Sequence, residues 1–220
     1  MKKDYLKGTD FVFYQDDELY KFNTDTYLLG TFFDFHKGKS VMDIGTNTGA
    51  LLLYASLRHP KELIGVDINE KALKVARHNL EANGVKATLI NSMIQELKHD
   101  QVDIIVCNPP FFKERDHRDN ENYNLAMFED SLPLDELFAS FRRLLKDNGK
   151  VYLNYPSFRI NELFKECERQ RFRIEKLTYV FEKEKKESFR SLLILKKGIM
   201  RQVRVSKPLL LENGAVKDLI

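Results

Sequence analysis

The chain has 220 residues, of which 43% are hydrophobic, and a formal net charge of +3. These values suit one compact domain with its own core, and they exclude an intrinsically disordered chain. Cys107 and Cys167 have no spacing typical of a metal site or a disulfide framework, which indicates a reducing compartment. The first residues lack the apolar run of a signal peptide, and no segment is long enough to span a membrane, so we expect a cytoplasmic protein.

The five histidines are scattered along the chain, and we therefore expect no metal site. No apolar stripe stands apart from the pattern of an ordinary core. The sequence leaves the oligomeric state open and favours a monomer.

Two short segments rich in aromatic and aliphatic residues open the chain. Residues 11–14 and 19–22 are interpreted as strands joined by an acidic turn, which predicts a small hairpin. Thr24 or Asp25 is placed to cap a helix that runs to about Phe35. We assign residues 1–38 to an extension that packs on the main domain.

A glycine-containing loop follows the first strand of that domain. Residues 41–44 form an apolar run typical of a buried strand, and residues 50–55 begin an apolar helix. Between them lies Gly45-Thr46-Asn47-Thr48-Gly49. Glycine accepts positive φ and lets the backbone approach a ligand, and the helix N-terminus adds unpaired N–H groups. Taken alone, the loop is a weak indication of a nucleotide site.

A second apolar strand, residues 62–67, ends in the carboxylate of Asp67. Asp67 lies 22 residues after Gly45. This is close to the spacing at which an acid binds ribose hydroxyls in nucleotide-binding α/β folds. Taken alone, the same acid also suits a cap for the helix predicted over residues 70–82.

The most informative motif, Asn108-Pro109-Pro110-Phe111, follows an apolar strand over residues 102–107. Prolines cannot donate to a sheet, so the strand must end there, and the residue before a proline is held near extended geometry. The result is a rigid carboxamide beside carbonyl oxygens that no prolyl N–H satisfies. These groups suit an –NH2 on a flat ring or an amide, and the competing interpretation is a plain strand-ending turn.

The remaining elements alternate between helix and strand, with strands near residues 87, 151, 172 and 191 and helices near residues 134 and 161. Such alternation predicts an α/β fold with a seven-stranded, mostly parallel sheet and ligands at the carboxyl ends of its strands. The last two strands, about 172–181 and 189–197, leave no room for a crossover helix and should pair antiparallel. We assign residues 39–198 to this domain and residues 199–220 to a tail.

Positive charge is concentrated in residues 165–207, which carry 14 Lys and Arg against 6 Glu. Its members include Arg169, Arg171, Arg173, Lys183, Lys185, Lys186, Arg190, Lys196, Lys197, Arg201 and Arg204. A footprint of this kind fits phosphate contacts with RNA. The competing interpretation is a solvated hairpin, because glutamates alternate with lysines in residues 182–187. A second basic group runs from Lys113 to Arg118.

The glycine loop, Asp67 and Asn108-Pro109-Pro110-Phe111 occur in the order expected for a nucleotide-like cofactor site. Together with Asp43-Ile44 before the loop, they resemble the S-adenosylmethionine-dependent methyltransferases that modify amino groups. Within that class the chain is most similar to bacterial tRNA(Val) adenine-N6 methyltransferases, which act on the adenine 3′ of the anticodon. Residues 22–30, 134–156 and 191–198 carry the softer part of this resemblance.

The resemblance implies a Rossmann-like class I methyltransferase fold, S-adenosylmethionine as cofactor and tRNA as partner. It implies that the cofactor is bound by Asp25, Asp43, Gly45, Asn47, Gly49, Asp67, Ile68, Ser92, Met93 and Asn108. It implies that the catalytic loop is made of Asn108, Pro109, Pro110 and Phe111. Plain structural roles compete for some of these residues: helix capping for Asp25, and capping or core packing for Ser92 and Met93.

The sequence departs from the family pattern at two positions. Asn47 replaces the middle glycine of the loop, and Asn is the non-glycine residue best able to adopt left-handed geometry. Phe128 stands before Glu129, where the family usually carries a histidine.

Other functions remain open at this stage. The same loop suits methylation of a release-factor glutamine or of guanine N2 in ribosomal RNA. A nucleotide-dependent oxidoreductase would use the glycine loop and Asp67 but leaves Asn108 to Phe111 unexplained. A protein that binds cofactor and RNA without turnover is a further alternative, to which Asn47 and Phe128 point.

Overall fold

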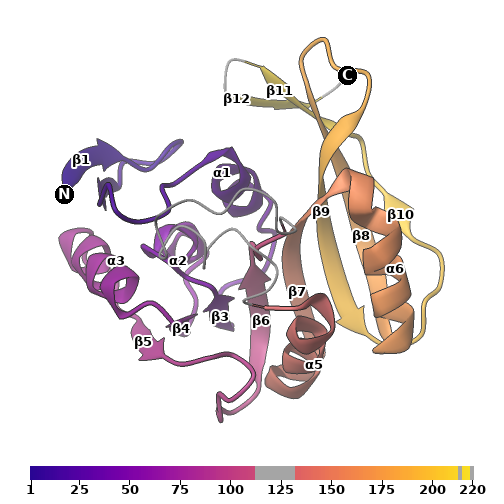
Figure 1. Ribbon diagram of the computed structural model, residues 1–220, viewed down its shortest axis with the longest axis horizontal. Coiled ribbons are helices and arrows are strands. Elements are labelled where there is room, and N and C mark those ends of the chain that lie inside the picture. Colours follow the sequence, from indigo (N-terminus) through magenta and orange to yellow (C-terminus); the bar gives the residue numbers. More distant parts are fainter. Residues whose placement is uncertain (112–131, 213–214, 219–220) are drawn as a thin grey trace.

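The computed structural model describes residues 1–111, 132–212 and 215–218 of the chain. Seven neighbouring strands, beginning at the edge strand β5, have the spatial order β5-β4-β3-β6-β7-β9-β8 (Figure 1). They are β3 (Ser40–Ile44), β4 (Glu62–Asp67), β5 (Thr88–Asn91), β6 (Val102–Cys107), β7 (Leu145–Pro156), β8 (Phe172–Glu182) and β9 (Ser188–Lys197). Neighbours from β5 to β7 are parallel, and β9 is antiparallel to both β7 and β8. The predicted α/β fold, with its antiparallel C-terminal pair, is confirmed.

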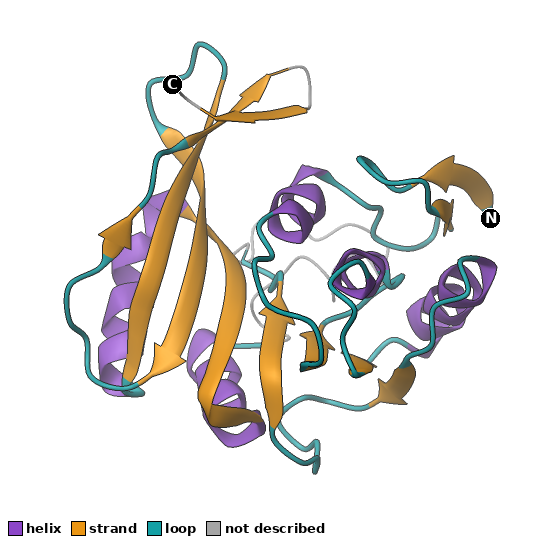
Figure 2. Cartoon of the chain, turned by 180° about the vertical axis from the view of Figure 1, so that it is seen from behind, coloured by secondary structure: helices purple, strands orange, loops and turns teal. Residues whose placement is uncertain are grey.

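Helices cover both faces of the sheet (Figure 2). They are α1 (Thr24–Thr31), α2 (Ala50–Ser56), α3 (Glu70–Ala82), α5 (Leu134–Leu144) and α6 (Ile160–Arg169). β6 shows the division, because Ile104 and Val106 belong to the core under α1 and α2, whereas Ile105 and Cys107 belong to the core under α5 and α6. A strand buried on both faces has no polar side, which explains the continuous apolar run in its sequence.

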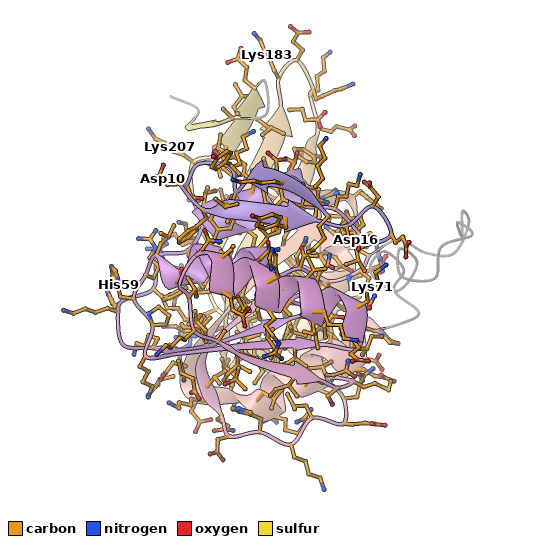
Figure 3. The ribbon with its side chains drawn as sticks, turned by 90° about the vertical axis from the view of Figure 1, so that its left-hand side faces the viewer. Asp10, Asp16, His59, Lys71, Lys183 and Lys207 are labelled. Atoms are coloured by element: carbon orange, nitrogen blue, oxygen red, sulfur yellow. The ribbon has the colours of Figure 1, made fainter. Side chains whose placement is uncertain are left out.

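The N-terminal hairpin forms from other strands than we predicted. β1 (Lys2–Tyr5) pairs antiparallel with β2 (Val12–Gln15), whereas residues 19–22 form no strand. Leu19 instead packs against Ala72 and Val75 of α3, and Lys71 of the same helix pairs with Asp16 and Glu18 (Figure 3). The acidic turn is thus held on α3, and the segment after it leads into α1 rather than back along β2.

Helix α1 was predicted with the wrong cap and the wrong end. Its N-cap is Asn23, whose Oδ1 accepts a hydrogen bond from the Thr26 N–H at 3.1 Å, and the helix ends at Thr31. Asn in extended geometry satisfies the free N–H groups of a first helical turn. Three phenylalanines beyond Thr31 leave the helix and contact the Tyr152 ring; they are Phe32, Phe33 and Phe35. This aromatic packing outweighs continuation of the helix.

The chain after β9 adds strands to the sheet. β10 (Arg204–Val205) and β11 (Leu209–Glu212) pair parallel with β8, and β12 (Ala215–Asp218) pairs antiparallel with β11. Leu209 and Leu211 pack against the core under α1. Seven predicted strands therefore become a sheet of ten within the described residues.

Gly30 determines how closely α1 approaches α2. A Cβ added at Gly30 would lie 2.3 Å from the Tyr54 ring, which is itself held because its hydroxyl donates to the Lys7 carbonyl at 2.6 Å. Gly30→Ala would normally stabilise a helix. Here we expect it to lower the free energy of unfolding by about 1–3 kcal/mol, because the ring must move. Denaturant unfolding measures this, with the exposed Thr31→Ala as a control within about 0.5 kcal/mol of wild type. An unchanged stability of Gly30→Ala would contradict the packing described.

Candidate active site

The spatial order of the parallel strands reverses at β3. The chain passes outward from β3 to β4 and β5 and then returns to place β6 on the other side of β3. The helix after β3 covers one face, and the helix between β6 and β7 covers the other. At such a point the carboxyl ends of the two strands stay uncovered, and ligands bind in the crevice outside them.

A cleft lies at this position, and most of the predicted site residues line it. They are Asp25, Gly45, Asn47, Asp67, Ile68, Ser92, Asn108, Pro109, Pro110 and Phe111. Three other predicted residues are outside the described lining: Asp43, Gly49 and Met93. The structure adds Tyr20, Phe22, Thr26, Asn69, Ile94 and Gln95 to the walls.

The glycine loop has the geometry expected from its sequence. Gly45, Asn47 and Gly49 have φ values of 74°, 46° and 84°. The prediction that Asn47 adopts left-handed geometry is therefore confirmed. Its side chain also has a function that glycine lacks, because Nδ2 donates to the Tyr20 carbonyl at 2.9 Å and ties the loop to the N-terminal segment. Gly49 lies under the loop, where a Cβ would come within 3.2 Å of the Ala76 Cβ.

Asp67 is held by backbone groups at the end of β4. Its Oδ2 accepts from the Asn47 N–H at 2.8 Å, and its Oδ1 accepts from the Asn69 N–H at 2.9 Å. Burial raises the pKa of this carboxyl, and the backbone N–H groups around it oppose the rise. Each oxygen can accept a further hydrogen bond, so the carboxylate is oriented and still able to bind hydroxyl groups.

Asp43 is a buried acid beside the Thr46 hydroxyl. Its side chain is 1% exposed, and neither oxygen has a hydrogen-bond partner among the described residues. Burial raises the pKa of Asp43 from 3.8 to about 7; the nearby Thr46 hydroxyl offsets a part of this rise, and the charge of Asp67 adds to it. An unpaired buried carboxylate costs stability unless a cation or donor comes to it. The carboxylate lies directly before the glycine loop and suits a positively charged ligand group, while Asp43 itself is outside the cleft lining.

Of the two site residues predicted after β5, one lines the cleft and the other does not. Ser92 lines the cleft, and its N–H donates to the Asp67 carbonyl at 3.1 Å. Met93 is 45% exposed, and the next residue, Ile94, lines the cleft in its place. Ile94 is 4% exposed, so it offers a rigid apolar wall.

The Asn108 carboxamide is fixed at the carboxyl end of β6. Its Oδ1 accepts a hydrogen bond from Asn154 Nδ2 at 2.9 Å. Since Pro109 and Pro110 have no N–H, the backbone beside it presents carbonyl oxygens. The cleft therefore offers a concentration of acceptors at this point.

Two arginines hold Phe111, which is 8% exposed. Arg159, itself 4% exposed, donates from Nη1 to the Phe111 carbonyl at 2.7 Å. Arg190 of β9 lies with its guanidinium 4.5 Å from the centroid of the Phe111 ring. Cation–π contact of this kind orders an aromatic side chain.

Arg190 also joins the N-terminal helix to the sheet. Its Nε and Nη2 donate to Oδ1 and Oδ2 of Asp25 at 2.8 and 3.0 Å. This bidentate geometry is the strongest form of the ion pair. The Asp25 carboxylate is occupied by this contact, so it is more than the helix cap that its sequence position favours.

Sequence reasoning did not identify Asn154 and Arg159, and it placed Arg190 in a basic surface. The acid at Asp25 indicated that a basic partner exists, but the spacing of residues in the sequence does not identify Arg190, which lies 165 residues away. Asn154 was detectable as a polar residue inside an apolar strand.

The basic segment, residues 165–207, divides between the two ends of the sheet. Arg173 and Lys183 are ten residues apart on β8 and its end, a distance of about 33 Å. Near the end of β8 that carries Arg173, Lys196 pairs with Glu175 at 2.5 Å and Lys197 pairs with Asp147 at 3.2 Å. The segment therefore presents two separate surfaces rather than one.

The second surface is the turn between β8 and β9. Pro156, the last residue of β7, is level with Arg190, so the turn at residues 183–187 extends past the carboxyl end of β7. Figure 1 shows this turn on the side toward which the β6 arrow points, and Figure 3 shows Lys183 projecting there. Lys185 and Lys186 are exposed there and have no ion pair within the described part of the chain, whereas Lys183 pairs with Glu212.

Some predictions fall outside the described residues, namely the basic group Lys113 to Arg118 and the departure at Phe128. Within the ranges that are described, no three His, Cys, Asp or Glu side chains are grouped as metal ligands. No helix there has the length and apolar character needed to cross a membrane.

A family described as the methyltransferase small domain matches residues 19–171, which is more than half of the chain. The chain belongs to this family. The enzyme is 30% identical over 164 residues to a Flavobacterium johnsoniae protein named tRNA1(Val) (adenine(37)-N6)-methyltransferase, and the alignment covers 71% of this chain and 68% of that protein.

Solved structures share the fold at lower identity. A Pyrococcus furiosus methyltransferase superimposes with a TM-score of 0.65 at 21% identity, covering 88% of this chain and 91% of that one. A Thermus thermophilus 16S rRNA N2 G1207 methyltransferase, solved with AdoMet and guanosine, gives 0.62 at 21% identity, covering 89% of this chain and 50% of that one. The class I methyltransferase fold is confirmed.

This methyltransferase uses S-adenosylmethionine, and its residues fit that cofactor. The unpartnered Asp43 carboxylate suits an ammonium group, and the oriented Asp67 carboxylate suits a pair of hydroxyls. Between them, the positive-φ loop brings the backbone close to the cleft.

Asp43 should make cofactor binding depend on pH. Because its ligand-free pKa is about 7, the carboxylate becomes protonated as pH falls from 7.5 to 5.5 and then attracts an ammonium group less. We expect the Kd for S-adenosylmethionine to rise by up to about tenfold per pH unit in this range. Calorimetry on Asp43→Asn should show weaker binding that no longer varies with pH. The exposed Asp10→Asn is the control that keeps the wild-type dependence.

The ligand-free protein gives an independent check of the same group. A pKa raised on folding means that the folded state binds more protons between about pH 4 and 7, so stability falls as pH rises through that window. The stability of Asp43→Asn relative to wild type should therefore increase from pH 5 to pH 8. A constant difference would show that Asp43 is already ionised at pH 5.

Proposed function

We propose that this enzyme transfers the methyl group of S-adenosylmethionine to the exocyclic N6 of an adenine in tRNA, at the adenine 3′ of the anticodon of tRNA(Val). The observation that carries the proposal is the Asn108 carboxamide, fixed at the cleft beside the Pro109 carbonyl. The name of the Flavobacterium johnsoniae relative supports the choice of substrate.

On the cofactor side, the proposed roles follow the donors and acceptors of the cleft. Asp67 accepts hydrogen bonds from the ribose hydroxyls, and Asp43 attracts the ammonium group above the glycine loop. Ile68 and Ser92 lie beside the adenine ring, with Ile94 as the apolar wall. Asp25, held by Arg190, closes the cleft from the side of α1.

On the substrate side, Asn108 Oδ1 and the Pro109 carbonyl accept the two hydrogens of the target amino group. These bonds favour a more tetrahedral nitrogen, whose lone pair then points at the methyl group. When bound, S-adenosylmethionine supplies an electrophilic methyl group on a sulfonium. A carbon–nitrogen bond forms as the carbon–sulfur bond breaks, and the amino nitrogen then loses a proton to water. Placement and oriented dipoles account for catalysis without a strong base.

Phe111 provides the surface on which the target base stacks in this proposal. Its ring lines the cleft and is held by Arg190. Enzymes that modify a base take it out of its stack, and a single-stranded loop gives up a base most easily. The anticodon loop fits this requirement.

The turn between β8 and β9 is the proposed tRNA contact outside the cleft. Lys185 and Lys186 are exposed beyond the carboxyl end of β7, where a nucleic acid entering the cleft passes. The turn also carries the exposed Glu184 and Glu187, so the contact depends on where Lys185 and Lys186 project and not on a net charge of the turn. The basic residues at the other end of β8 are about 33 Å away, and two of them, Lys196 and Lys197, pair with acids.

Nucleoside mass spectrometry tests the proposal directly. Purified protein is incubated with S-adenosylmethionine and bulk tRNA that lacks the modification, and N6-methyladenosine is expected, with fragment mapping to locate it beside the tRNA(Val) anticodon. A methylated guanosine would move the target to another base. Absence of any new nucleoside, with methylation of release-factor peptides instead, would overturn the tRNA assignment.

Replacing the carboxamide should separate chemistry from cofactor binding. We expect Asn108→Ala to retain its affinity for S-adenosylmethionine and to lose about 100-fold or more in kcat, as for removal of a placed transition-state group. The matched control is Asn148→Ala, exposed at the opposite end of β7, which should keep the wild-type rate. Equal activity of Asn108→Ala and wild type would refute the role given to this residue.

Neutralising the turn should weaken tRNA binding without changing the chemical step. The double variant Lys185→Gln/Lys186→Gln should raise the KM for tRNA by about tenfold and reduce its salt dependence, because two phosphate contacts are lost. Arg171→Gln/Arg201→Gln removes two exposed charges at the other end of the sheet and should leave KM unchanged. Equal effects of the two double variants would show a diffuse attraction in place of a defined contact.

A further inference from the structure

Asn154 is a carboxamide buried inside the sheet. It lies in β7 with 0% exposure, level with Leu192 of β9. Strands covered by helices on both faces normally carry apolar side chains. A polar residue at this position requires a specific reason.

Stability does not supply that reason. Nδ2 of Asn154 donates to Asn108 Oδ1 at 2.9 Å, whereas its own Oδ1 has no partner in the described part of the chain. A buried acceptor without a hydrogen bond destabilises the fold. An apolar side chain of similar volume would avoid that loss, so the fold alone favours a different residue here.

The strand register places this side chain against the catalytic loop. Cys107 of β6 is level with Leu153 of β7, so Asn108 and Asn154 follow at the same height. Val106 and Tyr152, two residues earlier on each strand, belong to the same core. Because side chains alternate along a strand, both carboxamides lie on that face of the sheet.

We infer that Asn154 is a positioning residue, which holds the Asn108 carboxamide in the orientation needed for methyl transfer to an amino group. This inference rests on the proposed function. A carboxamide turned by 180° exchanges its oxygen for an NH2 group, which would oppose a donor to the substrate amino group. The Asn154 hydrogen bond holds Oδ1 in place and leaves its second lone pair for the substrate. Such support of a reacting group shortens the search for the productive geometry.

Asn154→Leu separates this role from a structural one. We expect kcat to fall by about 10- to 100-fold and the Kd for S-adenosylmethionine to stay within about twofold, while the melting temperature stays equal or rises. A residue needed only for folding would lower the melting temperature instead. The matched control is Thr178→Val, since Thr178 is also buried and level with Leu192 but lies on β8, away from the cleft. It should keep the wild-type kcat.

Two further variants test the contact itself. Asn154→Asp offers only acceptors when it is ionised, so at a pH above the pKa of the new carboxyl it should turn the Asn108 carboxamide and lower kcat at least as far as the leucine variant. Asn154→Leu combined with Asn108→Ala should be no slower than Asn108→Ala alone, because both act through the same group. A wild-type kcat for Asn154→Leu, or an equal further loss in the Asn108→Ala background, would overturn the inference.

NMR in the absence of substrate tests the contact between Asn154 and Asn108 independently of the proposed function. The side-chain 15N–1H2 signals of Asn108, assigned by their loss in Asn108→Ala, should shift or broaden in Asn154→Leu and stay unchanged in Thr178→Val. Unchanged signals in the leucine variant would overturn the inference whatever the substrate is. If the wild type methylates no tRNA, the proposed function fails while these signals still decide whether Asn154 holds Asn108.

Discussion

Because β4 and β6 both run parallel to β3 while the helices α2 and α5 pass over opposite faces, these two helices leave a cleft at the carboxyl ends of the strands. Each strand ends there in a polar residue, Asp67 on β4 and Asn108 after β6, with the glycine loop after β3 between them. One topological constraint thus brings together groups that are up to 63 residues apart in the sequence.

One wall of the cleft comes from the N-terminal segment and not from the sheet. Arg190 of β9 connects that segment to the sheet. Its guanidinium pairs with Asp25 of α1 through two hydrogen bonds and lies over the Phe111 ring at the same time. Helix α1 and the loop after β6 are therefore ordered by one side chain. Since Arg190 is only 15% exposed, solvent screens this pair little, and loss of either partner would leave a charge poorly solvated.

The elements that follow from short-range pattern were predictable, and those decided by distant contacts were not. The strand at residues 102–107, the helix at residues 70–82 and the left-handed Asn47 all depend on nearby sequence. The hairpin partner was wrong because Lys71, more than fifty residues away, holds the acidic turn. The site shows the same division: strand ends and the proline motif were visible, whereas Asn154 and Arg190 reach it through the register of β7 and β9, and Arg159 reaches it from the short 3-10 turn after β7. Register is set by packing across the sheet, which a single sequence does not display.

The hydrogen-bond acceptors around Asn108 account for the proposed reaction at an amino group, but they do not account for the choice of substrate. A carboxamide oxygen and prolyl carbonyls bind any planar amino group, so adenine, guanine and glutamine satisfy them in the same way. Discrimination must therefore come from residues that touch the substrate away from the reacting nitrogen. In the proposed function the Phe111 ring selects for a flat partner, and the turn between β8 and β9 presents Lys185 and Lys186, beside Glu184 and Glu187, at the same edge. If these lysines contact phosphate as proposed, they favour a nucleic acid over a protein, and the choice of base is left to the shape of the cleft.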